Sequence, residues 1–214
     1  MLVANRMTPN PITCKPDLSI SETMEWMQRE DIRRFPVLDK NGKLVGIVTR
    51  HDLLHASPSS VSSLSVWEVN YLFSQVTVEE VMTTDVITVC EDCPIEEAAR
   101  IMARNKIGGL PVMRDDQLVG IITESDIFKV FLELFDAREK GVRLTVLAPY
   151  FKGSLAQISS KITEAGGLIL ALNVFRGDDP TNWGCTLKVT DITKDKLLQV
   201  VEPLVEKVID IREA

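Results

Sequence analysis

The 214-residue chain is 45% hydrophobic and 26% charged, a balance typical of a globular protein with one or two modest cores. Its apolar runs fall far short of the roughly 20 residues that a membrane-spanning helix needs, and its first residues lack the basic start and apolar stretch of a secretory signal. Residues 1–140 carry a net charge of −7 and residues 141–214 a net charge of zero, so neither part offers a basic surface for a nucleic-acid backbone. We therefore expect a cytoplasmic protein that binds neither membranes nor nucleic acid directly.

The first two-thirds of the chain repeat themselves at a nearly constant spacing. Met7-Thr8 aligns with Met82-Thr83 at an offset of 75 residues. After one deletion the offset becomes 74, and the segment GIVTRHD at 46–52 aligns with GIITESD at 120–126. Because a repeat of fixed period decides the architecture, we expect two copies of one structural unit.

Each copy predicts the order helix, strand, strand, helix. Apolar residues at positions i, i+4 and i+7 mark one helix face from Ile20 and another from Ile95. The turn at 39–42 separates two short apolar runs and predicts a hairpin, which the second copy repeats. The four predicted strands cover residues 36–38, 44–48, 111–113 and 118–122.

Both copies place an aspartate three residues after a threonine, at Thr49 and Asp52 and again at Thr123 and Asp126. This spacing is close to a helix capping box, which alone would explain it. Capping does not account for the choice of Asp over the longer Glu, or for the glycine kept in each preceding strand. A glycine inside a strand often marks the close approach of a ligand or of another backbone. On the residues alone, capping and ligand binding both stay open.

The cysteines and histidines predict no metal site. Cys90 and Cys93 have CxxC spacing but lack the second pair of a tetrahedral zinc site, and Cys90 ends an apolar run instead of opening a helix. We expect these two, like Cys14 and Cys185, to be ordinary buried thiols. The two histidines, His51 and His55, are too few for a metal cluster.

Together these features resemble a tandem pair of CBS (cystathionine-beta-synthase) domains over about residues 1–135. The match is specific because both copies carry a helix, a Pro-Val strand and a strand ending in GIVTRHD or GIITESD. In that family the paired repeats form a pseudo-twofold module with two clefts, many of which bind AMP, ATP, NAD or S-adenosylmethionine. The resemblance implies an adenine nucleotide as a regulatory ligand and no required cofactor. An aspartate can accept hydrogen bonds from both ribose hydroxyls, while a threonine hydroxyl and free helix amides favour a phosphate.

By that resemblance, each cleft combines polar residues of one repeat with an apolar wall from the other. The first cleft would contain Met7, Ile12, Ile32, Arg33, Ile121, Thr123, Ser125 and Asp126. The second would contain Ile47, Thr49, Arg50, His51, Asp52, Met82, Ile87, Ile107 and Gly108. Arg33 would bring its guanidinium to a phosphate in the first cleft, whereas the aligned position in the second cleft is Gly108. We therefore expect the two clefts to bind a nucleotide with unequal affinities. The alternative for Arg33, Arg34 and His51 is an ordinary solvated surface position.

Between the repeats, the polar stretch at 57–63 predicts a loop, and the residues at 66–73 predict an amphipathic helix. Residues 142–214 predict the order βαββαβ, which is the ferredoxin-like plan. Its second helix is expected to carry the apolar stripe of Leu197, Val201, Leu204 and Val208, although Pro203 must kink or restart it.

With Lys152-Gly153-Ser154-Leu155 at its first strand-to-helix turn, this region resembles an ACT domain. ACT domains commonly pair side by side and bind amino acids near that turn. The resemblance therefore implies a homodimer and an amino-acid site at Lys152, Gly153, Ser154, Leu155 and Asn173. The alternative is that Gly153 only makes the turn and Asn173 is only a polar residue on a strand. With the insert, this region resembles CBS proteins of the acetoin-utilisation regulator type.

We thus expect an α+β fold in which a CBS-domain pair precedes a ferredoxin-like ACT domain. The expected boundaries are 1–56 for repeat 1, 57–77 for the connecting loop and helix, 78–135 for repeat 2, 136–141 for a linker and 142–214 for the ACT-like domain. No nucleophile–base pair, carboxylate pair or metal set appears in the sequence, so we expect a non-enzymatic regulatory protein without catalytic residues. The alternative is a structural dimerisation module that binds no small molecule.

Overall fold

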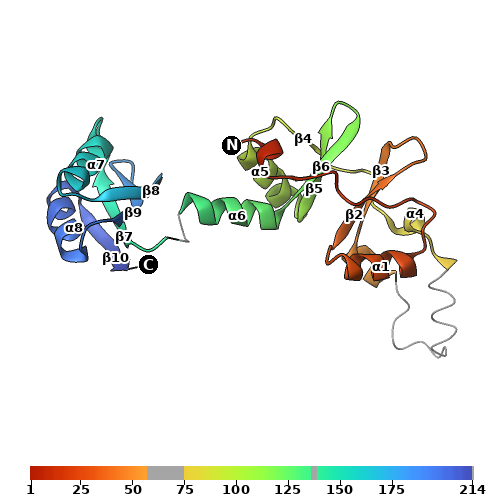
Figure 1. Cartoon of the computed structure of the whole chain (residues 1–214). Helices are drawn as coiled ribbons and strands as arrows, with labels where there is room; N and C mark the ends of the chain where they lie inside the picture. The colour runs from red at the N-terminus through yellow and green to blue at the C-terminus, as the bar shows by residue number, and fades with distance from the viewer. Residues whose placement is uncertain (57–74, 136–138, 214) are drawn as a thin grey trace. The chain divides into compact units, whose positions relative to one another are not determined.

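The structure, a computed structural model, describes residues 1–56, 75–135 and 139–213. The chain divides into two compact units, Met1–Ile127 and Phe128–Ala214, whose elements are labelled in Figure 1. Within the described residues, no helix combines the length and the apolar character needed to cross a membrane. The loop predicted at 57–63 and the helix predicted at 66–73 lie outside the described residues.

Both repeats fold as helix, strand, strand, helix, as predicted. Repeat 1 consists of α1 (Ile20–Arg29), β2 (Arg34–Leu38), β3 (Leu44–Thr49) and α2 (Arg50–His55). Repeat 2 consists of α5 (Ile95–Asn105), β5 (Gly109–Arg114), β6 (Gln117–Thr123) and α6 (Glu124–Leu134). The pairs β2–β3 and β5–β6 are antiparallel hairpins. Four short elements precede the two helices α1 and α5: η1 (Val3–Asn5), β1 (Thr8–Pro9), α4 (Val78–Val81) and β4 (Val89–Cys90).

The two repeats are joined because each lends an extended segment to the hairpin of the other. Thr8 of β1 pairs with Ile121 of β6. At the equivalent place, Ile47 of β3 and Thr83 exchange two backbone hydrogen bonds of 2.9 Å each. Since the same pairing occurs in both directions, the alignment found in the sequence corresponds to equivalent positions in space.

The glycine inside each hairpin makes room for a methionine of the lent segment. A Cβ atom at Gly46 would collide with the Sδ atom of Met82, and one at Gly120 with the Sδ atom of Met7. The close approach expected at these glycines is therefore made by the chain itself. Both glycines are buried and permit the exchange between repeats.

The core of repeat 1 packs the apolar face of α1 against its hairpin. Ile20 and Met27 are buried with Phe35 and Val48, and Val78 of α4 joins them from the second copy. In α5, Ala98 is fully buried whereas the predicted Ala99 is only half-buried. In α1, likewise, Thr23 is fully buried whereas the predicted Met24 is half-buried, and the other four predicted residues of the two faces are buried.

The second unit has the predicted order βαββαβ. Its elements are β7 (Val142–Pro149), α7 (Ser154–Glu164), β8 (Leu168–Arg176), β9 (Asn182–Thr190), α8 (Lys194–Val201), η2 (Glu202–Leu204) and β10 (Lys207–Glu213). The sheet order is β10-β7-β9-β8, with every neighbouring pair antiparallel. Buried side chains of α7 and α8, including Ile158, Ile162 and Leu197, share one core with Leu144 and Leu187 of the sheet.

The interruption expected at Pro203 is confirmed, but the helical stripe predicted through Leu204 and Val208 was wrong beyond Val201. Helix α8 ends at Val201, Leu204 lies in the following 3-10 turn, and Val208 already belongs to β10. Pro203 has no amide hydrogen to donate and clashes with the preceding turn, so the α-helix cannot continue through it.

The expectation of four ordinary buried thiols is correct for two cysteines and wrong for the other two. Cys14 and Cys185 are buried, and burial raises the pKa of each thiol to about 12. Cys90 is exposed, Cys93 is half-buried, and the two form a disulfide. The prediction failed because β4 ends at the surface and the next turn brings Cys93 back to it.

Candidate functional site

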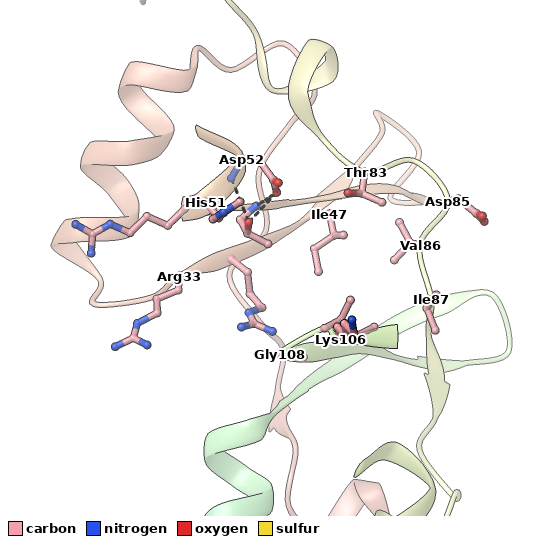
Figure 2. Close-up of a pocket in the computed structure, with 15 residues that line it drawn as sticks. Arg33, Ile47, His51, Asp52, Thr83, Asp85, Val86, Ile87, Lys106 and Gly108 are labelled. Carbon is pink, nitrogen blue, oxygen red and sulfur yellow. Dashed lines mark hydrogen bonds between the residues drawn. The ribbon is translucent and has the colours of Figure 1, made fainter. Parts of the chain in front are cut away.

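A cavity of about 580 Å³ lies between the two repeats of the first unit. Figure 2 shows that it is bordered by β3 and the start of α2, by the segment before β4, and by the loop before β5. Fifteen residues line it: Arg33, Arg34, Ile47, Thr49, Arg50, His51, Asp52, Thr83, Asp85, Val86, Ile87, Lys106, Ile107, Gly108 and Gly109.

The structure brings together eight of the nine residues expected in the second cleft. The ninth, Met82, is not among the lining residues, and its thioether lies against Gly46. Ile47 extends into the space between β3 and the loop that carries Gly108 (Figure 2). Ile87 is 39% exposed, which leaves a large apolar side chain at the cavity wall.

Asp52 caps α2 with only one of its two carboxylate oxygens. The Thr49 amide donates to Asp52 Oδ2 at 2.8 Å, and the Thr49 hydroxyl donates to the same oxygen at 2.7 Å. The Asp52 amide donates in return to Thr49 Oγ1 at 3.3 Å. Because Oδ1 takes no part in this capping box, capping and ligand binding are compatible at this residue.

The residues expected at the first cleft are placed by the same exchange between repeats. Thr123 donates to Asp126 Oδ2 from its amide at 3.0 Å and from its hydroxyl at 2.7 Å, and Asp126 is buried. Met7 lies against Gly120, and Ile121 pairs with Thr8. Three further members differ in burial: Ile32 packs against the core of repeat 1, Ile12 is 39% exposed and Ser125 is exposed. Arg33, which we expected in the first cleft, instead lines the cavity that contains the residues of the second cleft.

The cavity is basic. Four cations line it, namely Arg33, Arg34, Arg50 and Lys106, against the two carboxylates of Asp52 and Asp85. Such a site attracts anionic groups, and arginine is suited to a phosphate because its guanidinium donates two parallel hydrogen bonds.

Arg34 reaches across to the second repeat. A Cβ atom at Gly109 would collide with its Nη1 atom, and one at Gly108 would lie 2.8 Å from its Nη2 atom. Burial lowers the pKa of Arg34, an effect that nearby Glu124 opposes and Arg33 reinforces. Arg34 therefore occupies the space that two glycines leave open, rather than a solvated surface position.

Lys106 ends α5 in the left-handed conformation, with φ of 55°. Its aligned residue, Asp31, follows α1 with φ of 52°. For a residue other than glycine, this backbone conformation is unfavourable by about 1–2 kcal/mol. Both repeats accept this strain at the same position, but only Lys106 lines the cavity.

The aligned positions of the two clefts carry opposite charges. Arg50 aligns with Glu124, and Lys106 aligns with Asp31. The clefts are thus chemically unequal, and the described cavity is the basic one.

Sequence reasoning missed six of the lining residues. Thr83, Asp85 and Val86 lie between two residues already assigned to the cleft, and Lys106 and Gly109 flank two others, so continuity along the chain could have found these five. Arg34 follows directly after Arg33 and was considered with it, but its contact with the glycines of the other repeat carried no signal in the sequence.

Four of the five residues expected at an amino-acid site in the second unit form a turn or make contacts within the chain. Gly153 opens α7 with φ of 97°, and Ser154 Oγ accepts a hydrogen bond of 3.0 Å from the Trp183 indole. The Asn173 amide group donates to the Leu134 carbonyl at 3.0 Å. Lys152 is exposed and Leu155 packs against the core. A cavity of about 670 Å³ nearby in sequence, with Tyr150, Phe175, Arg176 and Trp183 in its wall, contains none of the five.

The comparison of this chain with known protein families agrees with its two internal repeats. The family model described as CBS domain matches residues 3–59 and 78–133, together more than half of the chain. The chain belongs to the CBS domain family.

Solved structures similar to this CBS-domain protein cover its paired repeats. A putative acetoin utilization protein (AcuB) from Vibrio cholerae is 37% identical, with a TM-score of 0.53, over 65% of this chain and 98% of that one. The CBS domain pair of protein MJ0100, in complex with 5'-methylthioadenosine and S-adenosyl-L-methionine, is 34% identical, with a TM-score of 0.51, over 61% and 95%. CBSX2 in complex with AMP is 31% identical, with a TM-score of 0.50, over 61% and 96%.

The first curated relatives are much longer than the matched region. They are named as enzymes, and this CBS-domain chain spans only 23% and 33% of their length. The similarity therefore concerns the CBS repeats.

Proposed function

We propose that this protein is a non-enzymatic sensor that binds a phosphorylated adenosine ligand such as AMP in the basic cavity. The observation that carries the proposal is the combination, in one cavity of about 580 Å³, of apolar side chains, a carboxylate with an uncommitted oxygen and four cations. The volume lies within the range of about 300–1,000 Å³ that small-molecule sites have.

In this proposal each part of the ligand meets a matching group. Ile47, Ile87 and Ile107 flank the adenine ring. Asp52 Oδ1 accepts hydrogen bonds from the ribose hydroxyls while Oδ2 keeps its capping bonds, so binding does not cost the cap. Arg50 and Lys106, with Arg33, hold the phosphate.

The charge of the cavity selects among adenosine ligands. The similar CBS pairs carry 5'-methylthioadenosine and S-adenosyl-L-methionine in one case and AMP in the other. A surplus of cations favours a phosphate over the positively charged sulfonium of S-adenosylmethionine. At the other cleft, Asp31 and Glu124 replace Lys106 and Arg50, so we infer weaker AMP binding there.

Calorimetry with AMP, 5'-methylthioadenosine and S-adenosylmethionine tests this proposal. We expect AMP to bind with an affinity that falls as salt rises, and the two ligands without phosphate to bind more weakly in the same cavity. Absence of binding by all three ligands would leave the alternative, a structural module whose Thr-Asp pairs only cap helices.

The variant Asp52→Asn separates the two roles of the carboxylate. Asparagine keeps one acceptor oxygen for the cap, so the free energy of unfolding should change little. Loss of the charged acceptor should weaken AMP binding by about 10- to 100-fold, since hydrogen bonds to charged groups contribute about 1.5–3 kcal/mol. Asp126→Asn is the matched control at the other cleft. Equal loss of AMP affinity in both variants would contradict the assignment of AMP to the basic cavity.

We also infer that the second unit is an ACT-like domain that pairs two copies of the chain. Support comes from its element order and from exposed apolar side chains on β8, one of the two edge strands of the sheet, including Leu168, Val174 and Phe175. Exposed apolar groups on an edge strand favour association. Analytical ultracentrifugation should detect a dimer that Val174→Lys weakens, and calorimetry with a panel of amino acids would test the site around Ser154. A monomer at all concentrations would contradict the pairing.

A further inference from the structure

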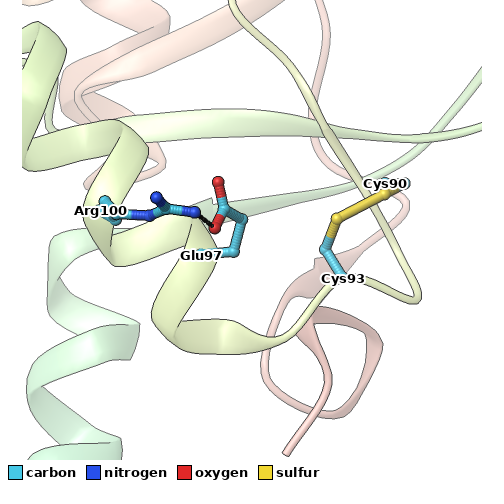
Figure 3. The surroundings of a disulfide bond; sticks show 4 residues. All are labelled: Cys90, Cys93, Glu97 and Arg100. Carbon is cyan, nitrogen blue, oxygen red and sulfur yellow. Dashed lines mark hydrogen bonds and ion pairs between the residues drawn. A yellow bond between two sulfur atoms is a disulfide. The ribbon is translucent and has the colours of Figure 1, made fainter.

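The disulfide between Cys90 and Cys93 lies in the turn that connects β4 to α5 (Figure 3). Their Cα atoms are 5.4 Å apart, within the usual range for a disulfide. Cys90 is exposed and Cys93 is half-buried. The bond is therefore within reach of a reactant in solution.

The same turn fastens the first residues of the chain. The Val3 amide donates to the Cys93 carbonyl at 2.9 Å, and the Ala4 amide donates to the Glu91 carbonyl at 2.8 Å. In return, the Ile95 amide donates to the Met1 carbonyl at 3.1 Å. These bonds place Val3 in the core, where it is fully buried.

The first repeat provides an internal control for this arrangement. Cys90 and Cys93 align with Lys15 and Leu18, which cannot form a disulfide. The three backbone bonds are nevertheless reproduced there: Val78 to Leu18 at 2.9 Å, Glu79 to Pro16 at 2.9 Å and Ile20 to Val76 at 3.0 Å. The turn thus forms without cysteines where Leu18 packs against the core instead, and folding alone does not require two cysteines in the second copy.

Stabilisation does not explain the pair either. The cysteines are three positions apart in the sequence, and a disulfide that closes so short a loop removes less entropy from the unfolded chain than one that closes a long loop. Exposed disulfides are moreover the ones open to exchange with other thiols. What the pair adds to the turn is its redox chemistry.

We propose that Cys90 and Cys93 form a thiol–disulfide exchange site for a dithiol, and that opening it loosens residues 1–4. A thiolate of the dithiol attacks the exposed sulfur of Cys90, forming a mixed disulfide and releasing Cys93 as a thiolate beside the start of α5. The second thiolate of the dithiol then attacks the dithiol sulfur that is bonded to Cys90 in the mixed disulfide. Cys90 is released, and the reactant becomes a disulfide, so two electrons and two protons pass to the cysteines.

The opened turn has a structural consequence because it carries the carbonyls that hold Val3 and Ala4. Without the bond, the turn from Cys90 to Cys93 gains conformational freedom, and the hydrogen bonds to residues 3 and 4 open more often. The same segment leads directly to Met7 and Thr8, which pack and pair with the second hairpin.

Thiol titration of the full chain in dithiothreitol redox buffers tests the chemistry. After oxidation, no thiol should react rapidly in the native protein, since Cys14 and Cys185 are buried; after reduction, two should react. The variant Cys90→Lys with Cys93→Leu copies the turn of repeat 1 and should show no rapidly reacting thiol in either state. Two rapidly reacting thiols in fully oxidising buffer would overturn the proposal. So would zinc that blocks both thiols from oxidation, because Cys90, Asp92 and Cys93 have ligand atoms within 4.8 Å of one another.

Amide hydrogen exchange on the same oxidised and reduced samples tests the coupling. Exchange at Val3 and Ala4 should accelerate on reduction, because the opened turn releases their hydrogen-bond acceptors more often. The aligned amides of Val78 and Glu79 serve as controls in the same molecule and should not respond. Equal exchange at Val3 and Ala4 in both redox states would refute the loosening of the segment.

Discussion

At the scale of single residues, the glycine in each repeated segment is explained by the methionine that packs against it, Met82 at Gly46 and Met7 at Gly120. Gly46→Ala places a methyl group against Met82, which must move within a packed interface. We expect a loss of about 1–3 kcal/mol in the free energy of unfolding, measured by chemical denaturation. Met82→Ala introduced into the same variant should recover part of that loss, as a double-mutant cycle would reveal. Additive effects of the two substitutions would contradict the contact.

At Lys106 we expect one substitution to change the stability of the protein and its affinity for AMP in opposite directions. Lys106→Gly relieves the left-handed conformation and should leave the protein as stable or up to about 1 kcal/mol more stable, while AMP binding weakens through loss of a cation. Asp31→Gly is the matched control, because it relieves the same strain away from the basic cavity. Stability is measured by denaturation and affinity by calorimetry. If Asp31→Gly weakened AMP binding as much as Lys106→Gly does, the loss could not be assigned to the Lys106 cation at the cavity.

At the scale of elements, two capping boxes can be compared. Ser19 and Glu22 cap α1, where the Glu22 amide donates to Ser19 Oγ at 3.2 Å, in the same way as Thr49 and Asp52 cap α2. Ser19→Ala and Thr49→Ala should each lower the free energy of unfolding by about 1 kcal/mol. Only Thr49→Ala should also weaken AMP binding, because it frees the carboxylate of Asp52 to turn. Equal affinities in the two variants would assign Thr49 to capping alone.

At the scale of the whole molecule, two units with separate cores predict separate unfolding. Scanning calorimetry of the full chain should resolve two transitions, of which AMP raises only the one that belongs to residues 1–127. Ligand at about 100 times its dissociation constant should stabilise that unit by about 2.7 kcal/mol. A single transition that shifts as a whole would contradict the independence of the two units.

Local patterns determined much of this protein from the sequence alone. The repeat, the order of its elements and the Thr-Asp caps follow from periodicities and hydrogen bonds that span only a few residues. Eight residues of the second cleft could be named because the resemblance to CBS domains assigns that cleft to positions within 47–52, at 87 and at 107–108. The end of the helix at Val201 was not predicted, since a stripe of apolar residues does not show whether Pro203 kinks the helix or ends it.

Only the tertiary structure decided what depends on contacts between distant segments. It placed Arg33 and Arg34 at the basic cavity, and the Arg34 side chain meets the second repeat where Gly108 and Gly109 leave space. It packed Met82 against Gly46 instead of at the cavity, because the lent segment pairs with the other repeat. It also brought Cys90 and Cys93 together at the surface, beside the first residues of the chain. Periodicity records which face of an element is buried, but not which partner buries it.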